Sequence, residues 1–201
     1  YSVAIFIAAV IEFPGRAMFQ IISPLVAKAL NDGDAPTLLK LLKKSANNLL
    51  LISGLLFLLI NLNLNDFYAW VNLGDYSVAL EVVLIVSLGK LFTMSLGCLN
   101  NIITNSKHYA YVFWFSTTSA ILAVVLNLYL IQWYGIIGAA YATLMVIVLI
   151  NFLKILLVQL RFKINPYSKK TFLTLGIVLI LYFTISEVSF EFDPFVSLVL
   201  R

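Results

Sequence analysis

Three charged side chains stand within stretches of the sequence that otherwise carry almost no charge: Glu12, Arg16 and Lys90. A charge near the centre of a lipid bilayer costs about 2.5–3.5 kcal/mol even on a lenient insertion scale, so such a group usually faces a cavity or a partner. Glu12 and Arg16 are four residues apart and therefore share one face of a helix. Either they neutralise each other and pin helices together, or Arg16 lines a water-filled cavity and binds an anionic substrate while Glu12 orients it.

Lys90 has no acidic residue within one helical turn. Glu81 stands near the outer end of the predicted span, and Lys90 lies much deeper in it. The ammonium group of Lys90 therefore cannot easily reach the water interface by extending along the helix. Lys90 therefore either forms a salt bridge with Glu12 from another helix or adds a cation to an internal space. We take Arg16, Lys90 and Glu12 as the candidate substrate-binding residues.

A Pro14-Gly15 pair lies between the two charges of the first segment. Proline removes a backbone hydrogen bond and crowds the preceding helical turn, so a bend is expected near Glu12 and Arg16. In transporters such breaks tend to lie beside binding sites and hinges. Because proline and glycine are also frequent in ordinary membrane helices, Pro14 and Gly15 are only a candidate hinge.

The sequence offers no other reactive constellation. The single cysteine, Cys98, lies in an apolar stretch, which excludes a disulfide framework and a cysteine-based metal site. The chain shows neither a Ser/His/Asp set, nor a phosphate-binding glycine loop, nor a pair of carboxylates within one apolar segment. We therefore expect no enzymatic activity, no metal and no cofactor.

The composition indicates how these residues are held. The chain is 62% hydrophobic and 11% charged, whereas soluble domains carry roughly 25% charged and about 45–50% apolar residues. A soluble fold of this length could not shield so much apolar surface from water, so we predict an all-α, polytopic bundle of transmembrane helices. The chain begins without methionine and ends within an apolar run, so we expect it to be part of a longer polytopic protein.

A helix needs about 20 apolar residues to cross a bilayer. The uncharged stretches predict six such spans and a truncated seventh after an acidic loop, with the six at residues 1–27, 45–65, 77–106, 109–131, 136–160 and 171–186. Residues 36–44 alternate leucine with lysine after Pro36, a pattern typical of a short interfacial helix in contact with anionic membrane lipids. Residues 1–161 are assigned to one lobe of about five spans, and residues 162–201 to additional C-terminal helices.

When the connections between spans are placed alternately on the two faces of the membrane, the charges separate. One face receives ten cations: Lys28, Lys40, Lys43, Lys44, Lys107, Lys154, Arg161, Lys163, Lys169 and Lys170. The other face receives none, apart from Arg201 in the truncated segment, and collects Asp66, Asp75, Glu81, Glu187, Glu191 and Asp193. Lys and Arg are retained on the cytoplasmic side, so the basic face is predicted to be cytoplasmic. The spread of cations over short connections also argues against nucleic acid as the partner.

Four short sequences occur in an order that resembles a known family. They are ISPLVA at 22–27 followed by NDGD at 31–34, LGDY at 73–76, GCLNNII at 97–103, and NLYLI at 127–131 followed by YGIIGAAYAT at 134–143. The last is similar to the pattern N-x-x-L-I-P-x-Y-G-x-x-G-A-A-x-A-T, with Gln132 in place of its proline. Over nearly its whole length the chain resembles the C-terminal half of polysaccharide-biosynthesis flippases, the Wzx-type O-antigen translocases of the multidrug/oligosaccharidyl-lipid/polysaccharide exporter superfamily.

The resemblance implies a MATE-like fold, with two six-helix lobes around a central cavity, of which this chain would be the second. It also implies alternating access, and transfer of a polyprenyl-pyrophosphate-linked oligosaccharide from the cytoplasmic to the outer leaflet of the bacterial inner membrane. Members of the family often use cavity arginines and lysines for the anionic head of the substrate, which is compatible with Arg16 and Lys90. Two alternatives stay open: a cation-coupled multidrug exporter of the same superfamily and a non-transporting membrane scaffold subunit.

Overall fold

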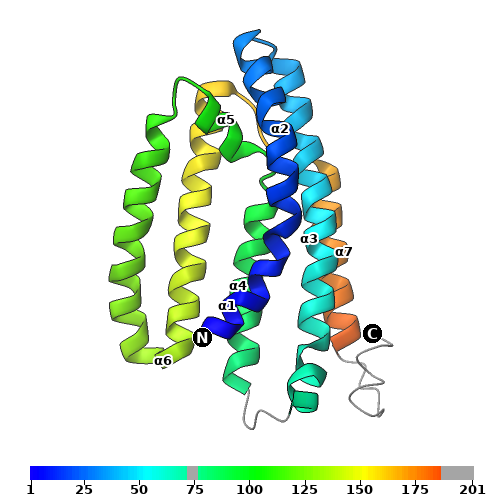
Figure 1. Cartoon of the computed structure of the whole chain (residues 1–201), viewed down its shortest axis with the longest axis vertical. Coiled ribbons are helices and arrows are strands. Elements are labelled where there is room, and N and C mark those ends of the chain that lie inside the picture. The colour runs from blue at the N-terminus through cyan, green and yellow to red at the C-terminus, as the bar shows by residue number, and fades with distance from the viewer. Residues whose placement is uncertain (72–76, 187–201) are drawn as a thin grey trace.

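The computed structural model describes residues 1–71 and 77–186, and these residues form an all-helical bundle whose long helices run along a common direction (Figure 1). The elements are α1 (Ser2–Ala9), the 3-10 turn η1 (Val10–Glu12), α2 (Phe13–Asn31), α3 (Ala35–Val71), α4 (Ser77–Met94), α5 (Leu99–Asn105), α6 (Ala110–Phe162) and α7 (Lys169–Ser186). Within the described residues, four helical segments are long and apolar enough to cross a membrane, and the bent pair α4–α5 is a fifth. The predicted all-α class is confirmed, and the helix lengths fit a membrane bundle.

The first predicted span is interrupted where a bend was expected. η1 separates α1 from α2, and Pro14 lies in the first turn of α2. Because the proline ring crowds the carbonyl four residues earlier, here that of Val10, the α-helical hydrogen-bond pattern gives way to a 3-10 turn from that residue onward. Gly15 continues the helix and lies close to α4, since a Cβ atom there would be 2.7 Å from the Met94 sulfur.

The separate interfacial helix predicted at 36–44 is instead the first part of α3, a continuous helix of 37 residues. No proline or glycine lies between Lys44 and Gly54, and the Ser45 hydroxyl donates a hydrogen bond to the Leu42 carbonyl within the helix, at 3.0 Å. Leu38 and Leu42 are buried among side chains of α2, α5 and α6. The leucine face of this stretch therefore packs against protein.

The start of α3 is fixed by the residue before it. The backbone N–H of Thr37 donates a hydrogen bond to Asp34 Oδ1, at 3.0 Å, which satisfies one of the free donors at the start of a helix. The same hydrogen bonding from Thr37 lowers the pKa of Asp34 below its usual value.

The span predicted at 77–106 is broken rather than continuous: α4 ends at Met94, and α5 follows at an angle of 56° after a four-residue break. Gly97 in this break has φ +59°, and a Cβ atom there would overlap the backbone nitrogen of Ala46 in α3. Only glycine combines a positive φ with so close an approach. The backbone N–H of Cys98 donates to the Ser45 hydroxyl at 2.9 Å and so fastens the break to α3.

α6, which contains the long uncharged stretch from 109 to 151 almost entirely, folds back on itself, as predicted for two spans broken at 132–135. Gly135 has φ +58° and ψ −134°, a conformation that other residues avoid. Figure 1 shows the two limbs of α6 side by side and antiparallel, with the turn at the lower end of the bundle. No residue from 110 to 134 is buried, whereas the second limb contributes Ala140, Ala142 and Val158 to the interior.

The connections from α2 to α3, from α5 to α6 and from α6 to α7 all lie at the upper end of the bundle in Figure 1. The cations that flank them therefore share one end, as the alternation of spans predicts. α7 packs along α3, where Val178 lies in the same buried cluster as Phe57. The LGDY motif at 73–76, which includes Asp75, lies outside the described residues. The predicted acidic loop and truncated segment also lie outside them, with Glu187, Glu191, Asp193 and Arg201.

Candidate binding site

Glu12 pairs with Lys90. The Lys90 ammonium nitrogen lies 3.0 Å from Glu12 Oε2, and the two side chains are 22% and 23% exposed. This is the interhelical salt bridge that the sequence left open for Lys90, and it excludes Arg16 as the ionic partner of Glu12 in this structure. Glu12 belongs to the 3-10 turn before α2, so the regular four-residue spacing that would align it with Arg16 is lost.

Arg16 is exposed and forms no ion pair with any residue from 1 to 71 or from 77 to 186. Its guanidinium carbon lies 5.4 Å from the centre of the Phe13 ring. A cation over an aromatic face is attracted by about 0.5–1 kcal/mol at an exposed site, which orients the guanidinium without neutralising its charge.

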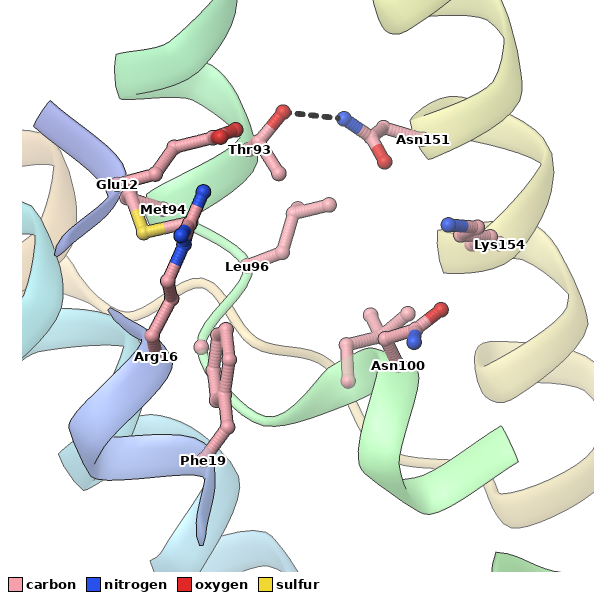
Figure 2. Close-up of a pocket in the computed structure, with 11 residues that line it drawn as sticks. Glu12, Arg16, Phe19, Thr93, Met94, Leu96, Asn100, Asn151 and Lys154 are labelled. Carbon is pink, nitrogen blue, oxygen red and sulfur yellow. Dashed lines mark hydrogen bonds between the residues drawn. The ribbon is translucent and has the colours of Figure 1, made fainter. Parts of the chain in front are cut away.

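Arg16 lines a cavity of about 290 Å³ within the bundle. The walls come from η1, α2, the end of α4, the break after it, α5 and the second limb of α6, as Figure 2 shows. The lining residues are Glu12, Arg16, Phe19, Thr93, Met94, Leu96, Gly97, Leu99, Asn100, Asn151 and Lys154. The interruptions at Glu12 and Gly97 thus border the same space.

Lys154 is the site residue that the sequence prediction missed, because it was assigned to the basic face with the loop cations. It lies on the second limb of α6, and Figure 2 shows its side chain on the opposite side of the cavity from Arg16. Lys154 stands seven residues before Arg161, which places it about 10 Å deeper along the helix. Two features of the sequence could have identified Lys154 as a site residue: its depth in the span and its spacing of three residues from Asn151.

Amide side chains complete the polar lining. Asn151 Nδ2 donates a hydrogen bond to Thr93 Oγ1, at 3.0 Å, and so joins α6 to α4 (Figure 2). Asn105 is turned toward α2 instead, where it donates to the Ser23 hydroxyl at 3.1 Å. Asn100 is exposed at the cavity, and its amide has no hydrogen-bond partner in the part of the chain that the structure describes. It is free to bind a ligand.

The charges around the cavity do not cancel. Glu12 and Lys90 neutralise each other, which leaves Arg16 and Lys154 as two cations without an ionic partner among the described residues. Lys90 is not among the residues that line the cavity, although its partner Glu12 is. The arrangement suits a ligand with about two negative charges, held between an arginine fork on one wall and an ammonium group on the other.

No protein-family model matches the chain, and no curated protein or solved structure is significantly similar to it.

Proposed function

We propose that this chain is the second lobe of a membrane flippase that moves a polyprenyl-pyrophosphate-linked oligosaccharide from the cytoplasmic to the outer leaflet of a bacterial inner membrane by alternating access. The observation that best supports the proposal is the cavity of about 290 Å³ with Arg16 and Lys154 on opposite walls. In such a flippase, an N-terminal lobe would supply the other half of the path.

A pyrophosphate group cannot cross lipid without compensation for its charge, and two fixed cations provide it. At an effective dielectric constant of about 20, two unit charges 4 Å apart attract by about 4 kcal/mol. Arg16 can bind two phosphate oxygens at once, whereas Lys154 acts as a point charge. Asn100 can bond to sugar hydroxyl groups, which both donate and accept hydrogen bonds.

The cavity composition speaks against the two alternatives. A cation-coupled drug exporter would favour carboxylates in the cavity, but among the described residues Glu12 is the only carboxylate in the lining, and it is paired with Lys90. A scaffold subunit would favour dry packing around Arg16, but the Arg16 side chain is exposed at a cavity.

The test is ligand binding by the full-length protein in lipid nanodiscs, with undecaprenyl pyrophosphate as the probe. Arg16→Gln and Lys154→Gln are each expected to lower the affinity by about 10- to 100-fold, since a hydrogen bond to a charged group contributes about 1.5–3 kcal/mol. Lys107→Gln removes one positive charge from a loop outside the cavity and is the matched control, with little change expected. Unchanged binding and unchanged export of surface polysaccharide in both cavity variants would overturn the proposal.

A further inference from the structure

A second basic site lies at the end of the bundle that carries the helix connections. A groove of about 610 Å³ runs between residues 40–48 of α3 and the start of α7. α3 and α7 pack side by side (Figure 1). Five lysines line it, three from α3 and two from α7: Lys40, Lys43, Lys44, Lys169 and Lys170. The two lysine groups are more than 120 residues apart in the sequence, so only the fold brings them together.

The positive charge of this groove is uncompensated. No acidic residue lines it, and none of the five lysines forms an ion pair with a residue in the described ranges 1–71 and 77–186. Lys169 and Lys170 occupy the first turn of α7, where the helix dipole disfavours cations. Mutual repulsion and the dipole both oppose this arrangement, and a bound anion would relieve both.

The surface beside the groove is apolar on both helices. On α3, Asn47 and Asn48 also line the groove. Leu51 and Ile52 follow them by one helical turn and are 49% and 44% exposed. On α7, Phe172 and Leu173 follow Lys169 by one turn and are 67% and 65% exposed. A ligand with an anionic head and apolar tails could place its head in the basic groove and its tails against the apolar side chains beside it. A free phosphate ion would contact only the basic groove.

We propose that this groove is a binding site for the headgroup of a phospholipid with two phosphodiester groups, cardiolipin. Basic pockets between membrane helices are suited to such headgroups, and two sets of lysines can each receive one phosphate. Asn48 also lines the groove, and its side chain is exposed there. The central glycerol hydroxyl of cardiolipin can hydrogen-bond to the Asn48 amide. This site does not depend on the proposed flippase activity.

The experiment measures lipid retention by native mass spectrometry on the full chain, purified in detergent and supplied with cardiolipin. The groove variant combines Lys43→Gln, Lys169→Gln and Lys170→Gln. The matched control combines Lys28→Gln, Lys107→Gln and Lys163→Gln, which removes the same charge from the same end of the bundle but outside the groove. Each lysine near an anionic lipid contributes about 1 kcal/mol, so the groove variant should bind cardiolipin about 100-fold more weakly.

The proposal requires that the control variant lose less than about tenfold, because its charges lie outside the site and are screened. Equal losses in both variants would overturn it, since binding would then follow net charge alone. Displacement of cardiolipin by millimolar inorganic pyrophosphate would also overturn it, in favour of a site for a soluble phosphate. Retention of phosphatidylglycerol as strongly as cardiolipin would contradict the requirement for two phosphates.

Discussion

The ammonium nitrogen of Lys90 lies 3.0 Å from Glu12 Oε2 and joins the C-terminal part of α4 to the 3-10 turn that precedes α2. Both partners are deep within apolar helices, where either charge alone would be costly. Because the pair is neutral as a unit, it fixes the interrupted helix against α4 and leaves Arg16 as a cation at the cavity.

The first prediction concerns this pair. Replacing one partner of a fully buried ion pair costs about 3–5 kcal/mol of stability. Glu12 and Lys90 are partly exposed, which reduces this cost. Glu12→Gln should therefore lower the free energy of unfolding by about 1–3 kcal/mol. The double variant Glu12→Gln/Lys90→Gln should be less destabilised than the sum of the two single variants, because no lone charge is left. Thermal unfolding in detergent measures all three. Glu81→Gln, at an exposed position, is the control, and strict additivity would contradict the pair.

The second prediction concerns the break between α4 and α5. Gly97→Ala should destabilise the protein by about 3 kcal/mol or more, since Gly97 combines φ +59° with a close approach to the Ala46 backbone. Gly176→Ala in α7 is the matched control, because a Cβ atom there has nothing within 4 Å. The control should leave the midpoint of thermal unfolding unchanged or raise it slightly. Equal effects of the two variants would mean that the break at Gly97 is not required.

The third prediction concerns His108, in the connection between α5 and α6. Partial burial, together with the charges of Arg161 and Lys107, lowers the pKa of His108 below its usual value. Nearby cations disfavour the charged imidazolium, so Arg161→Gln should raise the pKa of His108 toward its usual value. His108 is the only histidine in the chain, so an NMR titration reports it without ambiguity. Lys28→Gln, which removes a cation that does not perturb His108, should leave the titration unchanged.

Local signals predicted the interruptions at Pro14 and Gly135, because proline and glycine impose their effects through the backbone itself. The break at Gly97 was missed, since its cause is the approach of Ala46 in a different helix. The continuity of α3 was missed for the opposite reason: a change from basic to uncharged residues at Ser45 alters the surroundings of a helix without ending it. Contacts between helices also decide that Glu12 pairs with Lys90 and not with Arg16. They likewise decide that Lys154 lies at the cavity.

The fourth prediction concerns the sidedness of the bundle. Cys98 is fully buried, so a membrane-impermeant maleimide should not react with it. Labelling of a single cysteine introduced elsewhere therefore shows which side of the membrane that position faces. Lys44→Cys and Lys170→Cys lie at the end with the helix connections, and labelling of intact cells should leave both unmodified if that end is cytoplasmic. Trp133→Cys, at a position 80% exposed beside the turn at Gly135, should be labelled from outside. Permeabilised cells should show labelling at all three positions, which controls for accessibility. Should Lys44→Cys and Lys170→Cys react from opposite sides, α3 and α7 could not begin at the same membrane face, and neither the cavity nor the lysine groove would have the environment proposed for it.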